Sequence, residues 1–344
     1  MLGFQKSELS QIGRSLDRLF QSFGDDALYA RGSNTNLMLL AGAAPKEDLI
    51  EELVDLFSVS HPCRFFILRP DASLAKIQSE ITALCRRVGK SEHLCTEVIR
   101  ISFSPTAQAA VPGVVLANLM TGTGTELYLA DKSVSITDLQ NFGALAERIY
   151  YDCDCFGERF FQSGMAETLL AHGAALVDLN WIALGAWREQ IRLCFERVML
   201  RNANLRLAEI RLECPALSRS AAGALLAGWI VNRLGLRVSK GSGSGVRLED
   251  RHHHAMELNF KLSPGDQMRM VEFVFESGLS LKLASVPGGI ESHFGGGEYR
   301  LFAPVENEPR IELLRRYFLI GESVSNYKHS LEAALKIAAF IAPH

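Results

Sequence analysis

Halfway along the 344-residue chain stands the stretch Val177-Asp-Leu-Asn-Trp-Ile-Ala-Leu-Gly-Ala-Trp-Arg-Glu189, which begins a long amphipathic helix. Asp178 or Asn180 suits the N-cap, because a short polar side chain accepts a hydrogen bond from a free N–H of the first turn. The helical repeat predicts a buried face made of Leu184, Trp187, Ile191, Cys194, Phe195 and Val198. This helix separates two halves of the chain whose patterns differ.

Strands and helices alternate before this point. Apolar runs predict strands at 36–40, 64–68, 97–103, 126–129 and 148–152, and helical spacing predicts helices at 46–57, 111–120 and 137–147. Such alternation is typical of parallel βαβ units. We therefore expect an α/β domain with a layered, mostly parallel sheet over residues 30–175. An amphipathic N-terminal helix, at 10–23, is expected within residues 1–29.

The second half has hairpin-like spacing. Strands are predicted at 205–212, 256–262, 268–275, 279–285 and 299–302, and helices at 218–234, 310–319 and 325–339. Turn residues such as Ser263-Pro-Gly-Asp266 join the short strands. Residues 176–344 are therefore expected to form an α+β domain with an antiparallel sheet.

Composition narrows the classes of partner. The 36 basic and 39 acidic residues give a net charge of −3, whereas a nucleic-acid binder needs clustered cations to neutralise phosphates. The longest apolar run, residues 221–231, is too short to cross a hydrocarbon layer of roughly 30 Å. Seven scattered cysteines favour a reducing compartment over a disulfide framework. We expect a cytoplasmic protein that binds neither nucleic acid nor membrane.

Sequence motifs for catalysis are weak. The glycines of Gly122-Thr-Gly124 and of 241–245 precede predicted strands, whereas a phosphate-binding loop opens a helix. The run His252-His-His254 suggests a metal, but adjacent strand residues point to opposite faces, so a solvated loop is favoured. No G-x-S-x-G nucleophile motif is present. The sequence predicts no catalytic residue, no metal site and no cofactor.

Three cysteines are candidates for redox chemistry. Cys153 and Cys155 are separated by one residue, and a disulfide between them would be strained and therefore labile. Cys63 precedes Arg64, whose positive charge would lower the pKa of the thiol. The alternative is that all three are ordinary packing residues.

Trp, Arg and Asn also mark a candidate contact site in the central stretch. Trp and Arg dominate the binding energy of protein interfaces. The candidates for partner binding, or for a joint between the two domains, are Asp178, Asn180, Trp181, Trp187 and Arg188. Trp187 also falls on the buried helical stripe, so structural packing is the competing interpretation.

The same stretch resembles the glucose-6-phosphate dehydrogenase assembly protein family (OpcA), in which a D-L-N-W segment precedes W-R-E. Here these are residues 178–181 and 187–189. Further pieces in the family's order are Arg31-Gly-Ser-Asn-Thr-Asn36-Leu37, His61-Pro62-Cys63-Arg64, Cys85-Arg-Arg87, Glu97-Val-Ile99 and Gly228-Trp229-Ile-Val-Asn-Arg233-Leu-Gly235. The resemblance covers roughly residues 30–240. In place of the family's proline-rich run and paired-tryptophan strand, the chain has Val111-Pro-Gly113 and residues 126–130.

This resemblance implies a non-catalytic assembly factor or allosteric activator of glucose-6-phosphate dehydrogenase. Such a protein would support the oxidative pentose phosphate pathway and NADPH production without being an enzyme, and the dehydrogenase would be its partner. Two alternatives remain open: a sugar-phosphate-binding enzyme or sensor that uses the α/β domain, and a thiol-redox adaptor. The oligomeric state of the chain itself is not predicted.

Overall fold

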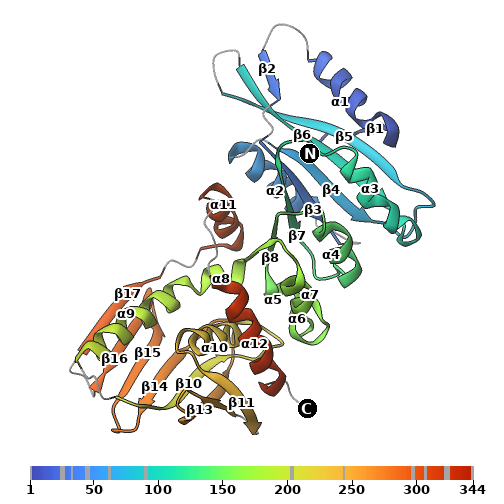
Figure 1. Cartoon of the computed structure of the whole chain (residues 1–344). Coiled ribbons are helices and arrows are strands. Elements are labelled where there is room, and N and C mark those ends of the chain that lie inside the picture. Colours follow the sequence, from blue (N-terminus) through green and yellow to red (C-terminus); the bar gives the residue numbers. More distant parts are fainter. Residues whose placement is uncertain are drawn as a thin grey trace. The chain divides into compact units, whose positions relative to one another are not determined.

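The computed structural model forms two compact units, which are described separately (Figure 1). It describes residues 2–23, 28–31, 34–42, 47–60, 63–88, 92–201, 205–242, 245–295, 299–305, 308–320 and 326–341. Unit 1 consists of Met1–Asp152, Ala171–Val177 and Arg310–Ser323. Unit 2 consists of Cys153–Leu170, Asp178–Pro309 and Val324–His344. Each unit is a mixed sheet with helices, as the sequence predicts in outline.

Unit 1 contains a nine-stranded sheet in the order β1-β5-β6-β4-β3-β7-β8-β9, with β2 paired to β6. The strands are β1 (Gln5–Ser7), β2 (Leu28–Arg31), β3 (Thr35–Leu40), β4 (Arg64–Pro70), β5 (Gln78–Arg87), β6 (Glu92–Phe103), β7 (Gly124–Leu129), β8 (Arg148–Tyr151) and β9 (Ala175–Asp178). The central pairs from β6 through β4, β3 and β7 to β8 are parallel, whereas β5 is antiparallel to β6.

The chain winds outward from β3 in both directions. It passes first through β4 to β6 and later through β7 and β8 to β9, so the topological switch point lies between β3 and β7. Residues 37–40 of β3 and 65–68 of β4 are at most 1% exposed. Such continuous apolar strands are typical of a parallel sheet that is covered on both faces.

Five α-helices are described in unit 1: α1 (Ile12–Gln21), α2 (Glu47–Ser60), α3 (Val111–Leu116), α4 (Ile136–Gly143) and α11 (Arg310–Ile320), with 3-10 helices at Leu9–Gln11 and Pro105–Ala110. Ser135 and Asp138 form a capping box that fixes the start of α4. The late helix α11 belongs here because the Phe318 ring packs 4.3 Å from that of Phe57 on α2 and 5.7 Å from that of Tyr150 on β8.

Unit 2 contains an eight-stranded sheet in the order β11-β12-β13-β10-β14-β15-β16-β17. Its strands are β10 (Leu207–Pro215), β11 (Arg237–Ser242), β12 (Gly245–Glu249), β13 (Ala255–Ser263), β14 (Met270–Phe275), β15 (Ser280–Val286), β16 (Gly289–Phe294) and β17 (Tyr299–Pro304). All neighbours are antiparallel except β10 and β13. In β14 the buried Val271, Phe273 and Phe275 alternate with less buried residues, because the sheet packs against the core on one face.

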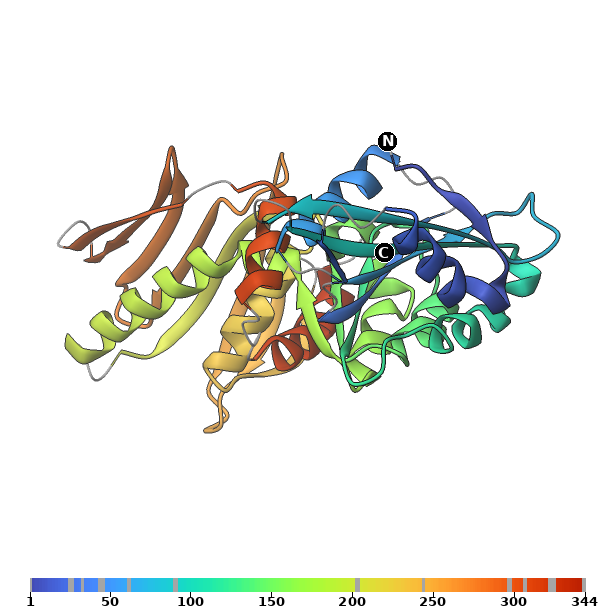
Figure 2. The same cartoon turned by 90° about the horizontal axis from the view of Figure 1, so that it is seen from above.

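The helices of unit 2 are α5 (Cys153–Phe156), α6 (Arg159–Gln162), α7 (Met165–Ala171), α8 (Leu179–Ala183), α9 (Gly185–Arg201), α10 (Ala222–Arg233) and α12 (Tyr327–Ile341). On α9, the ring of Phe195 lies 5.0 Å from that of Phe273 in the sheet. The helices α10 and α12 pack side by side (Figure 2), so closely that a side chain at Gly228 would overlap the carbonyl oxygen of Ser330. Among the described helices, none is both long and apolar enough to span a bilayer.

Candidate functional site

Asp178 is the centre of a buried polar network in unit 2. Its side chain is 0% exposed and caps α8, as expected for one of the two proposed N-caps. Oδ1 accepts the backbone N–H groups of Asn180 at 3.0 Å and of Cys153 at 3.2 Å. Oδ2 accepts the hydroxyl of Tyr327, at the start of α12, at 2.8 Å. One carboxylate therefore ties together α5, α8 and α12.

Asp154 extends this network to α10. Its Oδ1 accepts the side-chain amide of Asn180 at 2.6 Å and the backbone N–H of Ala221 at 2.7 Å. Its Oδ2 accepts the hydroxyl of Ser220 at 3.0 Å. Buried polar groups are costly unless they are paired, and here the partners come from α8 and from the residues that lead into α10. We refer to Asp154, Asp178, Asn180, Ser220 and Tyr327 as the Asp178 network.

The tryptophans and Arg188 lie against this network. The guanidinium of Arg188 stands 3.7 Å from the centre of the Trp181 ring and also donates to the carbonyl oxygen of Trp181. Trp181 is 3% exposed, and its ring lies 5.2 Å from that of Tyr327. Trp187 is 7% exposed. The structure therefore brings the sequence-predicted residues into the interior of unit 2, and their role in partner contact stays a prediction.

The three candidate redox cysteines have different surroundings. Cys153 is buried, and its sulfur accepts the amide of Asn180 at 3.5 Å, whereas Cys155 is exposed. Cys63 is buried, and this burial raises the pKa of its thiol, with a further contribution from Glu126. The expected lowering of this pKa by Arg64 is therefore wrong. The guanidinium of Arg64 instead pairs with the carboxylate of Glu97.

A disulfide that sequence reasoning missed joins Cys85 and Cys95. These residues face each other across the antiparallel pair of β5 and β6, with Cα atoms 4.0 Å apart. The expectation of reduced thiols throughout is wrong for this pair. Recognising β5 as a strand that returns along β6 would have revealed it, because the two cysteines are then in register.

Further motif residues form an ion cluster in unit 1 beside Arg64, the first residue of β4. The buried carboxylate of Glu97 accepts Nε of Arg64 at 2.6 Å and lies 3.4 Å from Nε of Arg31. Arg64 also donates to the carbonyl oxygen of Asn118 at 2.7 Å. The motif residues 61 and 62 lie outside the described part of the chain. This ion cluster ties β2, β4 and β6 together.

Asn36 plays a similar part at the start of β3. It is 0% exposed, and its amide nitrogen donates to the hydroxyl of Thr123 at 2.9 Å and to the carbonyl oxygen of Met120 at 3.2 Å. Its amide oxygen accepts the backbone N–H of Met120 at 2.8 Å. Doubly wound sheets hold ligands at the opposite, carboxyl edge. Asn36 and its partners therefore stabilise the edge of the sheet away from the usual ligand position.

At the carboxyl edge, the switch point brings Gly42 beside the loop after β7. A side chain at Gly42 would overlap the carboxylate of Asp131 and the hydroxyl of Ser133, whose N–H donates to that carboxylate at 2.7 Å. A phosphate at this contact would meet the negative charge of Asp131. Residues 43–46, which follow Gly42, lie outside the described part of the chain.

Two adjoining hollows mark the helical side of unit 2. The larger, of about 570 Å³, has an apolar lining that includes Phe195, Met199, Leu207 and Leu236 and a rim that includes Arg206 and residues 250 and 252–254. The smaller, of about 230 Å³, lies between α9 and α10. They share Phe195, Met199 and Leu234. We call the combined hollow the α9 groove.

The three consecutive histidines form part of this rim. His252 and His253 are exposed, as expected for a solvated loop. The carboxylate of Asp250 accepts the backbone N–H groups of His252 at 2.8 Å and of His254 at 2.9 Å. The ring of His254 pairs with Glu276 at 2.7 Å. The loop is thus held by Asp250 and by a side-chain contact to the end of β14.

These elements define a protein with a doubly wound α/β unit and a second unit in which helices cover a largely antiparallel sheet. Residues 174–295 match the family described as the C-terminal domain of the glucose-6-phosphate dehydrogenase subunit. The resemblance to the glucose-6-phosphate dehydrogenase assembly protein family is thereby confirmed. The matched residues run from the beginning of β9 to the end of β16. No curated protein matches the chain.

Solved structures that match the chain carry oxidoreductase names. A 3-ketoreductase from Actinomadura kijaniata in complex with NADP and TDP-benzene has a TM-score of 0.48 and 9% identity, over 89% of this chain and 96% of its own. A dehydrogenase from Chromobacterium violaceum has a TM-score of 0.47 and 11% identity, over 90% and 93%. An oxidoreductase from Thermotoga maritima has a TM-score of 0.46 and 10% identity, over 89% and 94%.

These matches correct two predictions made from the sequence. The chain was expected to be a non-catalytic assembly factor or allosteric activator, and not an enzyme. The solved structures named above carry oxidoreductase names, and both predictions are contradicted.

Proposed function

We propose that this protein associates with glucose-6-phosphate dehydrogenase and acts in the pentose phosphate pathway. The proposal rests on the match of residues 174–295 to a glucose-6-phosphate dehydrogenase domain family. Apart from residues 174–177, which belong to unit 1, the matched segment lies in unit 2. We therefore assign the contact with the enzyme to unit 2.

The construction of unit 2 supports this assignment. The Asp178 network fixes α5, α8, α10 and α12 with paired polar groups. A scaffold of this kind holds neighbouring surfaces in one conformation, which reduces the entropy lost when a partner binds. In this proposal Trp181, Trp187 and Asn180 hold a contact surface in place and do not themselves contact the partner.

The proposal is tested by mixing the full chain with glucose-6-phosphate dehydrogenase from the same organism. We expect the two proteins to co-elute in size-exclusion chromatography and to give a saturable binding curve by interferometry. An unrelated dehydrogenase serves as the control for nonspecific adsorption. Separate elution at concentrations of about 10 μM, where a stable interface would be occupied, would overturn the proposal.

A further inference from the structure

We propose that the α9 groove binds an amphipathic helical segment of the partner enzyme, with apolar residues on its buried face and acidic residues along its edges. This inference rests on the proposed function, since it names the surface and the chemistry of that association. The groove lies within unit 2 and is built from α9, α10 and the sheet beneath them. Its apolar lining and its charged rim each support the proposal.

The apolar wall on α9 repeats every four residues. Ile191, Phe195 and Met199 line the smaller hollow and lie on one face of the helix. Ile191 is buried, Phe195 is half-buried and Met199 is 36% exposed, so this stripe passes from the core to the surface along the helix. Parts of Phe195 and Met199 therefore remain open to water beside polar groups, which is the arrangement found at apolar interaction sites.

The opposite wall comes from α10 and the residues after it. Trp229 and Ile230 face the α9 stripe, and Phe273 of β14 also lines this hollow. Leu234 lines both hollows, and the larger one continues past it to Leu236. The two hollows share lining residues and therefore adjoin along α9. A helix laid between two helices fits such a space, as in other helix-in-groove complexes.

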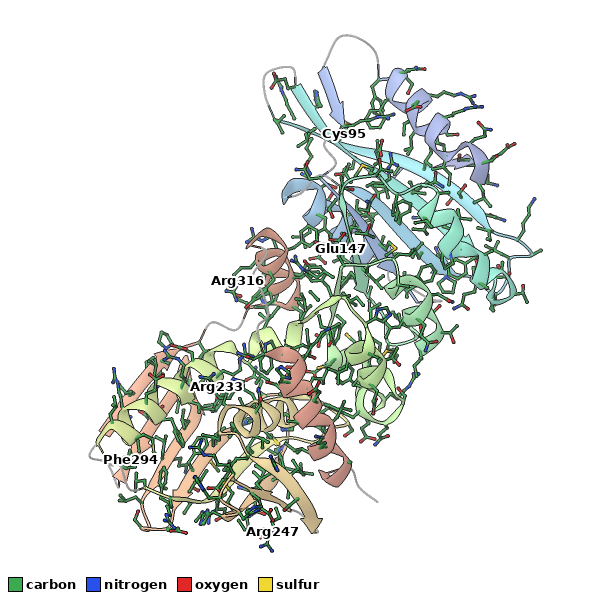
Figure 3. The ribbon with its side chains drawn as sticks, in the orientation of Figure 1. Cys95, Glu147, Arg233, Arg247, Phe294 and Arg316 are labelled. Carbon is green, nitrogen blue, oxygen red and sulfur yellow. A yellow bond between two sulfur atoms is a disulfide. The ribbon has the colours of Figure 1, made fainter. Side chains whose placement is uncertain are left out.

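The rim supplies the charge that the occupant must match. Arg233, which lines the smaller hollow beside α9 and α10 (Figure 3), and Arg206, on the larger hollow, are both exposed. Within the described residues, neither side chain has an ion pair. By contrast, Arg192 on the same rim is paired with Glu189 and Glu196, each at 2.7 Å. Two unpaired cations along an apolar groove favour acidic residues on the partner.

The lining is tested by Met199→Glu in the full chain, measured against glucose-6-phosphate dehydrogenase by interferometry. The matched control is Leu200→Glu, because Leu200 is 86% exposed and lies outside the groove lining. We expect Met199→Glu to weaken binding about tenfold or more, since it places a charge in a desolvated contact. Leu200→Glu should leave the affinity unchanged. Circular dichroism and thermal melts verify that both variants fold.

The rim is tested by the double variant Arg206→Glu/Arg233→Glu. The control is Arg247→Glu on β12, an exposed arginine that lines neither hollow (Figure 3). We expect the double variant to lose affinity and most of the salt dependence of binding, because screening acts on exposed charge pairs. The control should retain both.

The outcomes separate this inference from the proposed function. If the unmodified chain binds the enzyme and folded groove variants bind equally well, the inference fails and the proposed function stands. If the unmodified chain does not bind, both fail. A chain that is dimeric on its own and becomes monomeric with Met199→Glu would show that a second copy fills the groove, which also overturns the inference.

Discussion

The Asp178 network and the α9 groove lie in the same unit and differ in how their polar groups are satisfied. In the network, each oxygen of Asp178 and of Asp154 accepts at least one hydrogen bond from a neighbouring element. In the groove, Arg206 and Arg233 stand exposed beside apolar side chains. The polar groups of the Asp178 network are therefore paired within the protein. The α9 groove, by contrast, has arginines without an ion pair among the described residues and exposed apolar surface.

This difference shows the limit of residue type as a guide to function. Trp, Arg and Asn are enriched at binding hot spots, yet Trp181, Arg188 and Asn180 are engaged within the protein. The groove is built from ordinary residues such as Met199 and Arg206, which belong to none of the sequence motifs. Unsatisfied surface, rather than unusual composition, distinguishes a docking region from a structural one.

The largest effect is expected from Asp178→Ala. The substitution removes a cap and leaves the Tyr327 hydroxyl and two backbone N–H groups without their acceptor in the interior. We expect a loss of about 3–5 kcal/mol in the free energy of unfolding, measured by urea denaturation. The control, Asp71→Ala, removes a carboxylate near the surface that accepts hydrogen bonds from Ser73, and it should change stability far less. Similar losses in the two variants would mean that the network is not the stabilising region we describe.

A somewhat smaller effect is expected from Gly228→Ala, which tests whether the network and the groove share a wall. The new methyl group would overlap the carbonyl oxygen of Ser330 and lie 2.7 Å from the backbone nitrogen of Ala334. Because backbone cannot yield as a flexible side chain does, we expect α10 and α12 to separate, at a cost of about 2–3 kcal/mol. Gly113→Ala in α3, where the added methyl group meets nothing within 4 Å, should not destabilise.

Affinity should fall together with stability in Gly228→Ala, because α10 carries both Trp229 of the groove and the contact to α12 that seats Tyr327. Binding to glucose-6-phosphate dehydrogenase is measured below the melting temperature of the variant. A destabilised but folded variant with full affinity would show that the groove is independent of α12.

Much of the fold is predictable from the sequence because its periodicity is local. The strands at 64–68 and 126–129 and the helix at 310–319 fall within β4, β7 and α11. No predicted strand covers β5, because its residues 78–87 do not alternate cleanly between buried and exposed positions where the strand pairs with β6. The packing of α11 on unit 1 was not predicted either, since an amphipathic pattern indicates a buried face but not the surface that covers it.

The site was less predictable, for a physical reason. Asp178, Asn180, Trp181 and Arg188 lie close together in sequence at the start of the central helices, so the sequence could single them out as one set. Their partners Tyr327 and Asp154 lie far away in sequence, so the hydrogen bonds of the set could not be predicted. The groove depends on which side chains remain exposed after the helices have packed on the sheet. The exposure of a side chain follows from the folded structure and not from the local sequence pattern.

Arg188→Ala is expected to have a moderate effect that separates the two regions. It removes the contact of the guanidinium with the Trp181 ring and its hydrogen bond to the Trp181 carbonyl oxygen, at a cost of about 1–2 kcal/mol. Arg192→Ala on the same helix removes only exposed ion pairs and should cost less. If Arg188 belongs to the closed region, the affinity of the folded variant for the enzyme stays within about twofold of the unmodified chain. A larger loss of affinity would make Arg188 a contact residue and break the distinction between network and groove.

The smallest perturbation is thiol labelling, which reports on the closed region without a mutation. Cys153 is buried beneath the Asp178 network, and burial raises the pKa of Cys63, so little reactive thiolate is available at either position in the folded protein. Cys155, which follows Cys153 closely in sequence but is exposed, should react with iodoacetamide at about pH 8, near the ordinary thiol pKa. Peptide mass mapping should find the label on Cys155 first and on Cys153 only after denaturant is added. Equal labelling of Cys153 and Cys155 under native conditions would mean that the Asp178 network opens readily. The network and the α9 groove would then not differ in how accessible they are to solvent.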